Sequence, residues 1–141
     1  MANRAGVAGL ITYGADGPKM DLHIDIELQG GLLLVTASGI LEFEAAVRLL
    51  KQACDVANEK GTNKVLVNTF AVDGELSVSE RYRIGVEIAA YVKQRQMNTR
   101  LAIVGKTPTI NGFGVLVAQN RDLVTNAFAS QEEAVNWLDA L

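Results

Sequence analysis

Two serines at the start of an expected helix are the residues of this sequence best placed to do chemistry. Ser77 and Ser79 follow a short apolar run over 64–68 and a turn-like stretch over 69–76. A helix N-terminus presents free N–H groups and a favourable dipole to an anion, so we expect a candidate phosphorylation or anion site at these serines. The alternative is a structural role, because Ser77 and Glu80 have the spacing of a capping box.

Further polar side chains follow the apolar runs that we expect to form parallel strands. Ligands of open α/β sheets bind near the carboxyl ends of the strands, so these side chains form a candidate rim for a partner or a ligand. The rim residues are Asn68, Asp73, Glu75, Arg81, Lys106 and Asn111. The alternative is ordinary loop chemistry, since turns and caps use the same residue types.

Three other patterns do not lead to a catalytic or metal site. His23 lies between Asp21 and Asp25 on one strand face, but a solvated strand supplies no closed coordination shell. Cys54 falls on the inward stripe of an expected helix, where a thiol acts as a small hydrophobe. The Gly-Lys-Thr sequence at 105–107 lacks the upstream glycine of a phosphate-binding loop. We therefore expect no catalytic residue, no metal site and no cofactor, and hence no enzyme.

The composition is that of one ordinary globular domain. The 141 residues are 49% hydrophobic and 21% charged, and the net charge of −3 gives no reason to expect nucleic acid as a partner. The single cysteine, Cys54, fits a reducing cytoplasm. The apolar patch over 7–11 is too short to span a membrane. We expect residues 1–18 to form a flexible N-terminal tail and residues 19–141 to form a single α/β domain.

Hydrophobic periodicity predicts alternating strands and helices. The expected strands are 21–28, 32–37, 64–68, 100–104 and 123–128, and the expected helices are 42–60, 77–96, 112–120 and 131–141. A turn at 29–31 joins the first two strands as a hairpin, and Ser38 and Gly39 end the second strand. The order β-β-α-β-α-β-α-β-α predicts an α/β fold with a mixed, mostly parallel five-stranded sheet whose first strand is antiparallel at one edge.

The segments that carry this order also resemble a known family. They are Lys64-Val-Leu-Val-Asn68, Gly74-Glu-Leu-Ser-x-x-Glu-Arg81, Gly112-Phe-Gly114, Val117-Ala-x-Asn-Arg121 and Phe128-x-x-x-x-x-Ala134-x-x-Trp-Leu138. Over residues 21–141 the chain resembles the STAS domain, the fold of the bacterial anti-sigma-factor antagonists, and the uncharacterised bacterial STAS/SEC14-like proteins. The resemblance implies a STAS/SpoIIAA-like fold and a non-enzymatic signalling module.

The same resemblance implies a regulatory role for one serine. In the antagonists, a serine at the start of the helix after the central strand is phosphorylated by the partner kinase, and this modification blocks partner binding. The resemblance places this role at Ser77 or Ser79. The antagonists carry an Asp-Ser pair in the loop, whereas this chain reads Asp73-Gly-Glu-Leu-Ser77, with Glu75 placing negative charge where a phosphate would sit.

We expect two possible functions, and the first is protein binding. The chain would bind a protein partner, or itself as a homodimer, through the loop over 72–79 and the exposed side of the helix over 77–96. Arg81 and Arg83 would lie beside that surface. The alternative is a carrier or sensor of a small apolar ligand, held in a pocket between helix and sheet. The expected lining of that pocket is Tyr82, Tyr91, Phe113 and Phe128.

Overall fold

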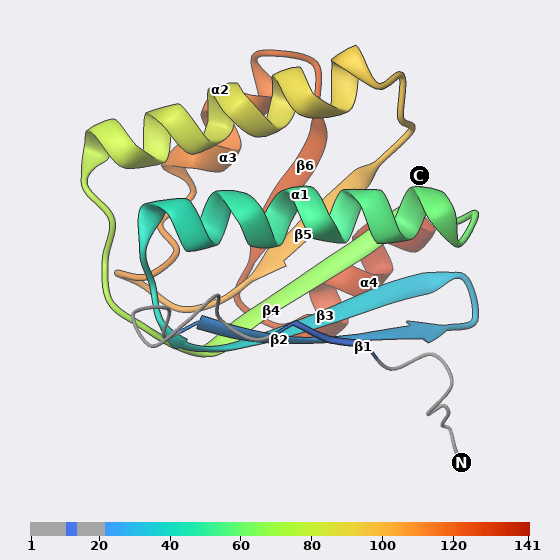
Figure 1. Cartoon of the computed structure of the whole chain (residues 1–141), viewed down its shortest axis with the longest axis horizontal. Helices are drawn as coiled ribbons and strands as arrows, with labels where there is room; N and C mark the ends of the chain where they lie inside the picture. Colours follow the sequence, from blue (N-terminus) through green and yellow to red (C-terminus); the bar gives the residue numbers. More distant parts are fainter. Residues whose placement is uncertain (1–10, 14–21) are drawn as a thin grey trace.

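The computed structural model describes residues 11–13 and 22–141 as a mixed sheet with helices on both faces (Figure 1). The elements in chain order are β1 (Ile11–Tyr13), β2 (Leu22–Gln29), β3 (Leu32–Ile40), α1 (Phe43–Glu59), β4 (Lys64–Asp73), α2 (Val78–Gln94), β5 (Arg100–Val104), α3 (Phe113–Gln119), β6 (Val124–Phe128) and α4 (Gln131–Asp139). The strands lie in the order β1 to β6; β1, β2 and β3 are antiparallel, and β3 to β6 are parallel. The predicted α/β class and the order of its elements are confirmed.

The sheet has one strand more than the sequence predicts. β1 pairs with the outer side of β2, with Ile11 opposite Ile26, so β2 is not the edge strand that we expected. This strand lies inside the segment expected to be a flexible tail, and the rest of that segment lies outside the described residues. The hairpin between β2 and β3 is confirmed. Its turn places Gly30 and Gly31 at φ values of 51° and 90°, in the left-handed region that glycine reaches without strain.

β3 and β4 are both longer than their apolar runs suggest. The expected break at Ser38 and Gly39 is a β-bulge, after which β3 continues beside β4 with Ser38 opposite Ala71 and Gly39 opposite Val72. The stretch over 69–76 was expected to be a turn, but most of it is strand, because the prolonged β3 supplies its hydrogen-bonding partner. The loop between β4 and α2 is therefore only residues 74–77.

Two separate apolar cores cover the two faces of the sheet. The larger core lies between the sheet and α1, α2 and α3, and it includes Ile26, Val67 and Ile88. The smaller core lies between the sheet and α4, where Leu66 and Leu138 are fully buried. Full burial of a leucine side chain contributes about 1.5–3 kcal/mol, so each core holds its helices by apolar contact. Among the helices described, none is both long and apolar enough to cross a membrane.

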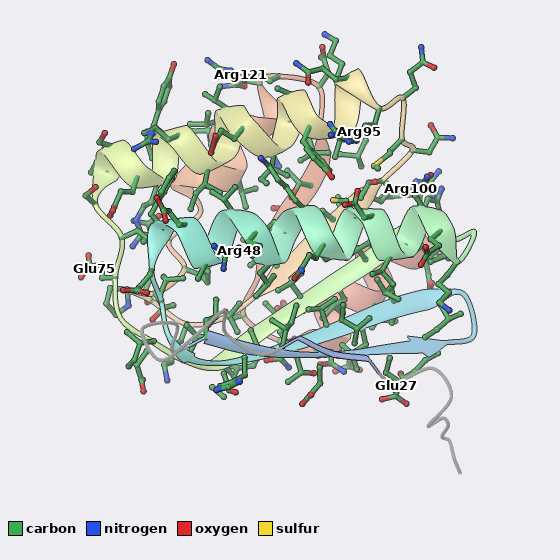
Figure 2. All side chains as sticks on the ribbon, in the orientation of Figure 1. Glu27, Arg48, Glu75, Arg95, Arg100 and Arg121 are labelled. Atoms are coloured by element: carbon green, nitrogen blue, oxygen red, sulfur yellow. The ribbon has the colours of Figure 1, made fainter. Side chains whose placement is uncertain are left out.

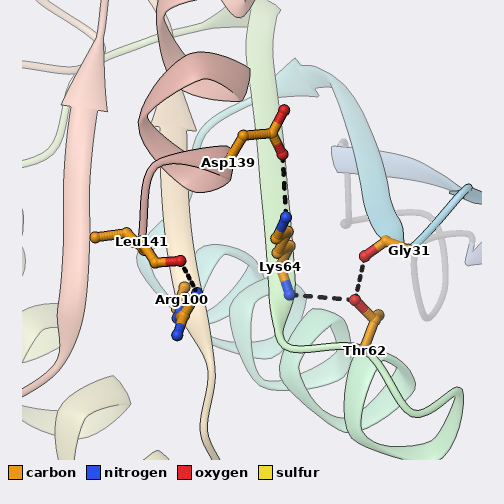
Figure 3. A network of polar contacts seen from close by, with 6 residues as sticks. All are labelled: Gly31, Thr62, Lys64, Arg100, Asp139 and Leu141. Carbon is orange, nitrogen blue, oxygen red and sulfur yellow. Dashed lines mark hydrogen bonds and ion pairs between the residues drawn. The ribbon is translucent and has the colours of Figure 1, made fainter.

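Polar contacts join α4 and the residues after it to the starts of two strands (Figure 3). The Lys64 ammonium lies 3.1 Å from the Asp139 carboxylate, and the Arg100 guanidinium donates to the main-chain oxygen of Leu141 at 3.0 Å. The ion pair is exposed and contributes at most about 1 kcal/mol. These contacts therefore orient the end of α4, whereas its apolar face provides most of the stability.

α2 and α3 approach closely because small residues face one another. A Cβ atom added to Gly85 would lie 2.6 Å from the carbonyl oxygen of Gly114 and 2.8 Å from the Cβ of Val117. No side chain larger than a hydrogen atom fits at Gly85 unless the two helices separate.

We predict that Gly85→Ala destabilises the protein by about 2 kcal/mol, within the usual range for overpacking. Alanine normally favours a helix over glycine by about 1 kcal/mol, so a loss of stability identifies the close contact as its cause. Urea unfolding measures the effect. Gly114→Ala is the graded control, because its added Cβ would lie 3.1 Å from the main-chain oxygen of Arg81 and should cost less. A Gly85→Ala protein as stable as the parent would contradict the prediction.

Candidate functional site

The two candidate serines have different environments at the start of α2. The Ser77 hydroxyl accepts a hydrogen bond from the Glu80 N–H at 3.1 Å, and the Glu80 carboxylate accepts one from the Ser77 N–H at 2.9 Å. The predicted capping box is therefore confirmed. Ser79 is exposed, and its hydroxyl makes no hydrogen bond within the described part of the chain. Of the two hydroxyl groups, that of Ser79 is the one free to react.

Arg81 is buried, although the sequence placed it on an exposed partner surface. Only 6% of the residue is accessible. Its guanidinium donates from Nε to the Leu76 carbonyl at 3.0 Å, from Nη1 to the Thr109 carbonyl at 3.2 Å and from Nη2 to the Pro108 carbonyl at 2.7 Å. No carboxylate in the described chain lies within 4 Å of it. The expectation of exposure is wrong because three carbonyl oxygens replace water around the charge.

A pattern in the sequence could have revealed this burial. Arg81 shares a helical stripe with four residues that follow it at spacings of four, seven, eight and eleven. The buried residues of α2 are Arg81, Gly85, Ile88, Ala89 and Val92. Hydrophobicity alone does not identify this stripe, because it begins with the charged Arg81 and with Gly85. The apolar residues of the helix instead favoured a neighbouring face, which includes Tyr82, as the buried one.

The arginine holds two loops together at the carboxyl end of the parallel strands. It contacts the loop before α2 through Leu76 and the loop after β5 through Pro108 and Thr109. The Thr109 hydroxyl donates to the Gly74 carbonyl at 2.9 Å and links the same two loops a second time. We call Arg81, Thr109 and their carbonyl partners the loop clamp.

The predicted rim residues do not gather at one place. Asp73 and Glu75 are exposed beside the start of α2, and Figure 2 shows Glu75 at the outer edge of the molecule where the chain enters this helix. The Asn111 side chain accepts from the Phe113 N–H at 3.0 Å and turns the chain into α3. The other two rim residues lie apart from these. The Asn68 amide donates to the Gln131 side chain of α4 at 2.9 Å, and Lys106 approaches the Phe70 carbonyl at 3.4 Å.

An apolar cavity of about 130 Å³ lies behind the loop clamp, between the sheet and its helices. Val67, Val72 and Ile103 line it from the sheet, and Leu49, Ile84 and Ile88 line it from α1 and α2. The polar lining residues are Thr69, Arg81, Thr109, Asn111 and Thr125. A pocket between helix and sheet was expected as the alternative, and the cavity has this location.

The aromatic lining predicted for that pocket is wrong. None of the four aromatic residues borders the cavity. Phe128 lies near Trp137 of α4, with ring centroids 5.5 Å apart, and therefore belongs to the smaller core. Tyr82 is about half exposed, and the Tyr91 hydroxyl contacts the Asp55 carboxylate at 2.7 Å. Aliphatic residues fill the positions that we assigned to aromatic rings.

Cys54, His23 and the acidic side chains do not form a catalytic or metal site among the described residues. Burial raises the pKa of the Cys54 thiol from 9.0 to about 12, so the thiol is protonated at neutral pH and is a poor nucleophile. His23 is exposed on β2, opposite Ser38 of β3. Within residues 11–13 and 22–141, no three His, Cys, Asp or Glu side chains come close enough to hold a metal ion.

Comparison with solved structures identifies the fold. The chain is similar to an anti-sigma factor antagonist from Mycobacterium paratuberculosis, with a TM-score of 0.56, 18% identity, and coverage of 84% of this chain and 94% of that one. It is also similar to an uncharacterized protein from Shewanella loihica described as having a SpoIIAA-like fold, with a TM-score of 0.47, 19% identity, and coverage of 89% and 99%. No protein-family model and no curated protein matches the sequence. The similarity to the antagonist confirms the expected STAS-like fold.

We predict that Ser77→Ala lowers the free energy of unfolding by about 1 kcal/mol, the usual cost of losing an N-cap. Ser79→Ala is the matched control, since its hydroxyl makes no hydrogen bond in the described chain, and its unfolding midpoint should stay within error of the parent. Urea unfolding measures both variants. Equal midpoints for Ser77→Ala and the parent would show that the capping box contributes nothing.

We predict that Arg81→Lys destabilises the protein by about 3 kcal/mol, although the charge is retained. A single ammonium group cannot reach three carbonyls spread over two loops, and each buried carbonyl left unpaired costs about 1–3 kcal/mol. The control is Arg83→Lys on the same helix, because Arg83 is exposed and lies over the Phe43 ring at 4.2 Å. That change should cost less than about 1 kcal/mol. Similar losses from the two variants would mean that the clamp geometry is unimportant.

Proposed function

We propose that this protein is a non-enzymatic protein-interaction module of the bacterial cytoplasm. Its partner would bind a surface formed by Val78 and Tyr82 of α2 and Leu116 of α3, which we call the α2 surface. The observation that carries the proposal is the exposure of these apolar side chains, which reaches 70% at Val78.

The α2 surface has the arrangement of a docking site. Val78 and Tyr82 are four residues apart and so lie on one face of α2, one turn from the other. Tyr82 is 46% exposed and Leu116 is 51% exposed, on two helices that pack against each other. Tyr82 also accepts a hydrogen bond at its hydroxyl from Arg121, which fixes the ring at the surface. Exposed apolar side chains of this kind are typical of protein interfaces.

Acidic residues near the start of α2 indicate the charge of the partner. Asp73 ends β4 and Glu75 lies in the loop 74–77, and both side chains are exposed. The Leu41 N–H donates to the Asp73 carbonyl, so the exposed Glu42 at the start of α1 lies near them. A basic partner would meet this charge favourably. A second copy binding through the same surface would bring like charges together, so these charges support a hetero-partner over the homodimer that we also expected.

Ser77 and Ser79 are the proposed site of regulation. Phosphorylation would add a charge of about −2 beside Val78, and this charge would alter the affinity of any partner on the α2 surface. Ser79 is the better site for phosphorylation, because its hydroxyl is free whereas that of Ser77 caps the helix. The anion-binding alternative has less support, since Asp73 and Glu75 repel anions from this end of α2.

The cavity supports a second candidate function, the binding of a small apolar ligand. Its volume of about 130 Å³ is well below the 300–1,000 Å³ typical of drug-sized ligand sites. It is close to the engineered apolar cavity of about 150 Å³ that admits benzene. The cavity therefore suits a group the size of one ring and is too small for a complete lipid chain.

Site-specific photocrosslinking tests the interaction function. A photoreactive phenylalanine analogue in place of Val78 should give one discrete crosslinked species in the host cell, and mass spectrometry identifies its partner. The same analogue in place of exposed Glu132 on α4 is the control and should give none. Tyr82→Ser should abolish the species. Equal crosslinking from both positions, or none from Val78, would contradict the proposal. Light scattering at micromolar concentration then tests self-association, for which we expect a monomer.

A further inference from the structure

The polar side chains that line the interior of the cavity are already bonded within the protein. The hydroxyls of Thr69, Thr109 and Thr125 each donate to a main-chain carbonyl at 2.7–2.9 Å. The Arg81 guanidinium donates to the three carbonyls of the loop clamp. Most of the other lining residues are aliphatic. The interior therefore suits an apolar group, which leaves all of these hydrogen bonds in place.

The cavity reaches the surface beside the loop that leads from β5 to α3. Asn111 in this loop is exposed, and its neighbours Ile110 and Gly112 are half-buried, although all three line the cavity. Leu41, which precedes α1, is a further half-buried lining residue. These four residues, which we call the cavity mouth, give a group outside the protein access to the interior.

Gly74 places the loop before α2 at the cavity mouth. A Cβ atom built on Gly74 would lie 3.5 Å from the Cβ of Leu41, so the two residues are in contact. The Gly74 carbonyl also accepts a hydrogen bond from Thr109, which directly precedes the mouth residue Ile110. Gly74 therefore contacts both sides of the mouth, and the side chains that flank it in the sequence lie at the rim.

The charges at the cavity mouth are negative. Asp73 and Glu75 flank Gly74, Glu42 follows directly after Leu41, and all three carboxylates are exposed. None of the three forms an ion pair within the described chain. The exposed cations of the adjoining segments are engaged elsewhere, with an aromatic ring of α1 for one and a carbonyl of β4 for the other. The mouth therefore favours a cation, whereas the interior favours an apolar group.

We propose that a basic segment of the partner inserts one phenylalanine-sized apolar side chain into the cavity. The basic side chains of the segment remain outside, beside the three carboxylates of the mouth. The size follows from the volume of about 130 Å³, which is near that of an apolar cavity that takes up one benzene ring. An apolar side chain anchored in a pocket is a common centre of binding energy in interfaces.

This inference rests on the proposed interaction function and specifies the chemistry of the partner. The cavity mouth and the α2 surface are continuous, because the loop 74–77 leads directly into Val78. A single partner segment can therefore contact both.

Three blocked pentapeptides, RAFAR, RAAAR and EAFAE, test the inference with the intact protein. Nuclear magnetic resonance titration follows the amide signals of the cavity mouth. We expect RAFAR to bind about tenfold or more tightly than RAAAR, because burial of a phenylalanine side chain is worth at least about one power of ten in affinity. RAFAR should also bind more tightly than EAFAE, and this preference should shrink as salt is added, since the carboxylates are exposed.

Variants assign the binding to the cavity and its mouth. Ala46→Leu places a larger side chain at a lining position and should remove the advantage of RAFAR over RAAAR. Ala140→Leu, at an exposed position that does not line the cavity, is its control and should change neither affinity. Glu75→Lys should weaken RAFAR about threefold or more. Glu132→Lys makes the same charge change at an exposed position of α4 and should have no such effect.

The outcomes separate this inference from the function on which it rests. Equal affinity for RAFAR and RAAAR, or an advantage that survives in folded Ala46→Leu, would show that no side chain enters the cavity and would overturn the inference. Equal affinity for RAFAR and EAFAE would overturn the basic segment. The crosslink from Val78 tests the interaction function itself. A crosslinked partner that is retained in Ala46→Leu would overturn the inference and leave that function standing, whereas its loss in Ala46→Leu but not in Ala140→Leu supports both.

Discussion

The buried guanidinium of Arg81 is the interaction on which this end of the molecule depends. Three carbonyl oxygens surround it, two of them 27 and 28 residues later in the sequence. The hydrogen bonds offset the cost of removing the charge from water, and they fix the loop before α2 against the loop after β5. The shape of the candidate site follows from this contact, because both loops border the cavity and one of them leads into the α2 surface.

Both proposed functions use residues in the first turns of α2. Val78 and Tyr82 lie on the outside of these turns, and Arg81 lies on the inside, where it lines the cavity. The close approach of Gly85 to Gly114 holds α3, and with it Leu116, at a fixed distance from the same helix. The buried and the exposed side of these turns therefore belong to one short segment of α2.

The sheet separates this end from the face covered by α4. Asn68 shows the separation most clearly: it follows the buried run of β4, yet its side chain contacts Gln131 of α4 and not the loop clamp. Side chains alternate between the two faces of a strand, so neighbouring polar residues at a strand end can point to different cores. For this reason the six rim residues, which lie in β4, in the loops after β4 and β5 or in the first turn of α2, do not form one site.

The sequence by itself determined the four helices, with their starts, and the presence of five of the six strands. Periodicity of two and of about 3.6 residues, the capping box at Ser77, the N-cap serine at 130 and the glycine turn at 30–31 are local signals, and the structure keeps them. Only the tertiary structure decided the rest. The bulge that prolongs β3 and β4, the burial of Arg81 and the aliphatic lining of the cavity each depend on groups from distant segments. The helical stripe of α2 indicates which face is inward, but a charged side chain such as Arg81 is buried only where distant carbonyls replace its water, and local patterning contains no information about those carbonyls.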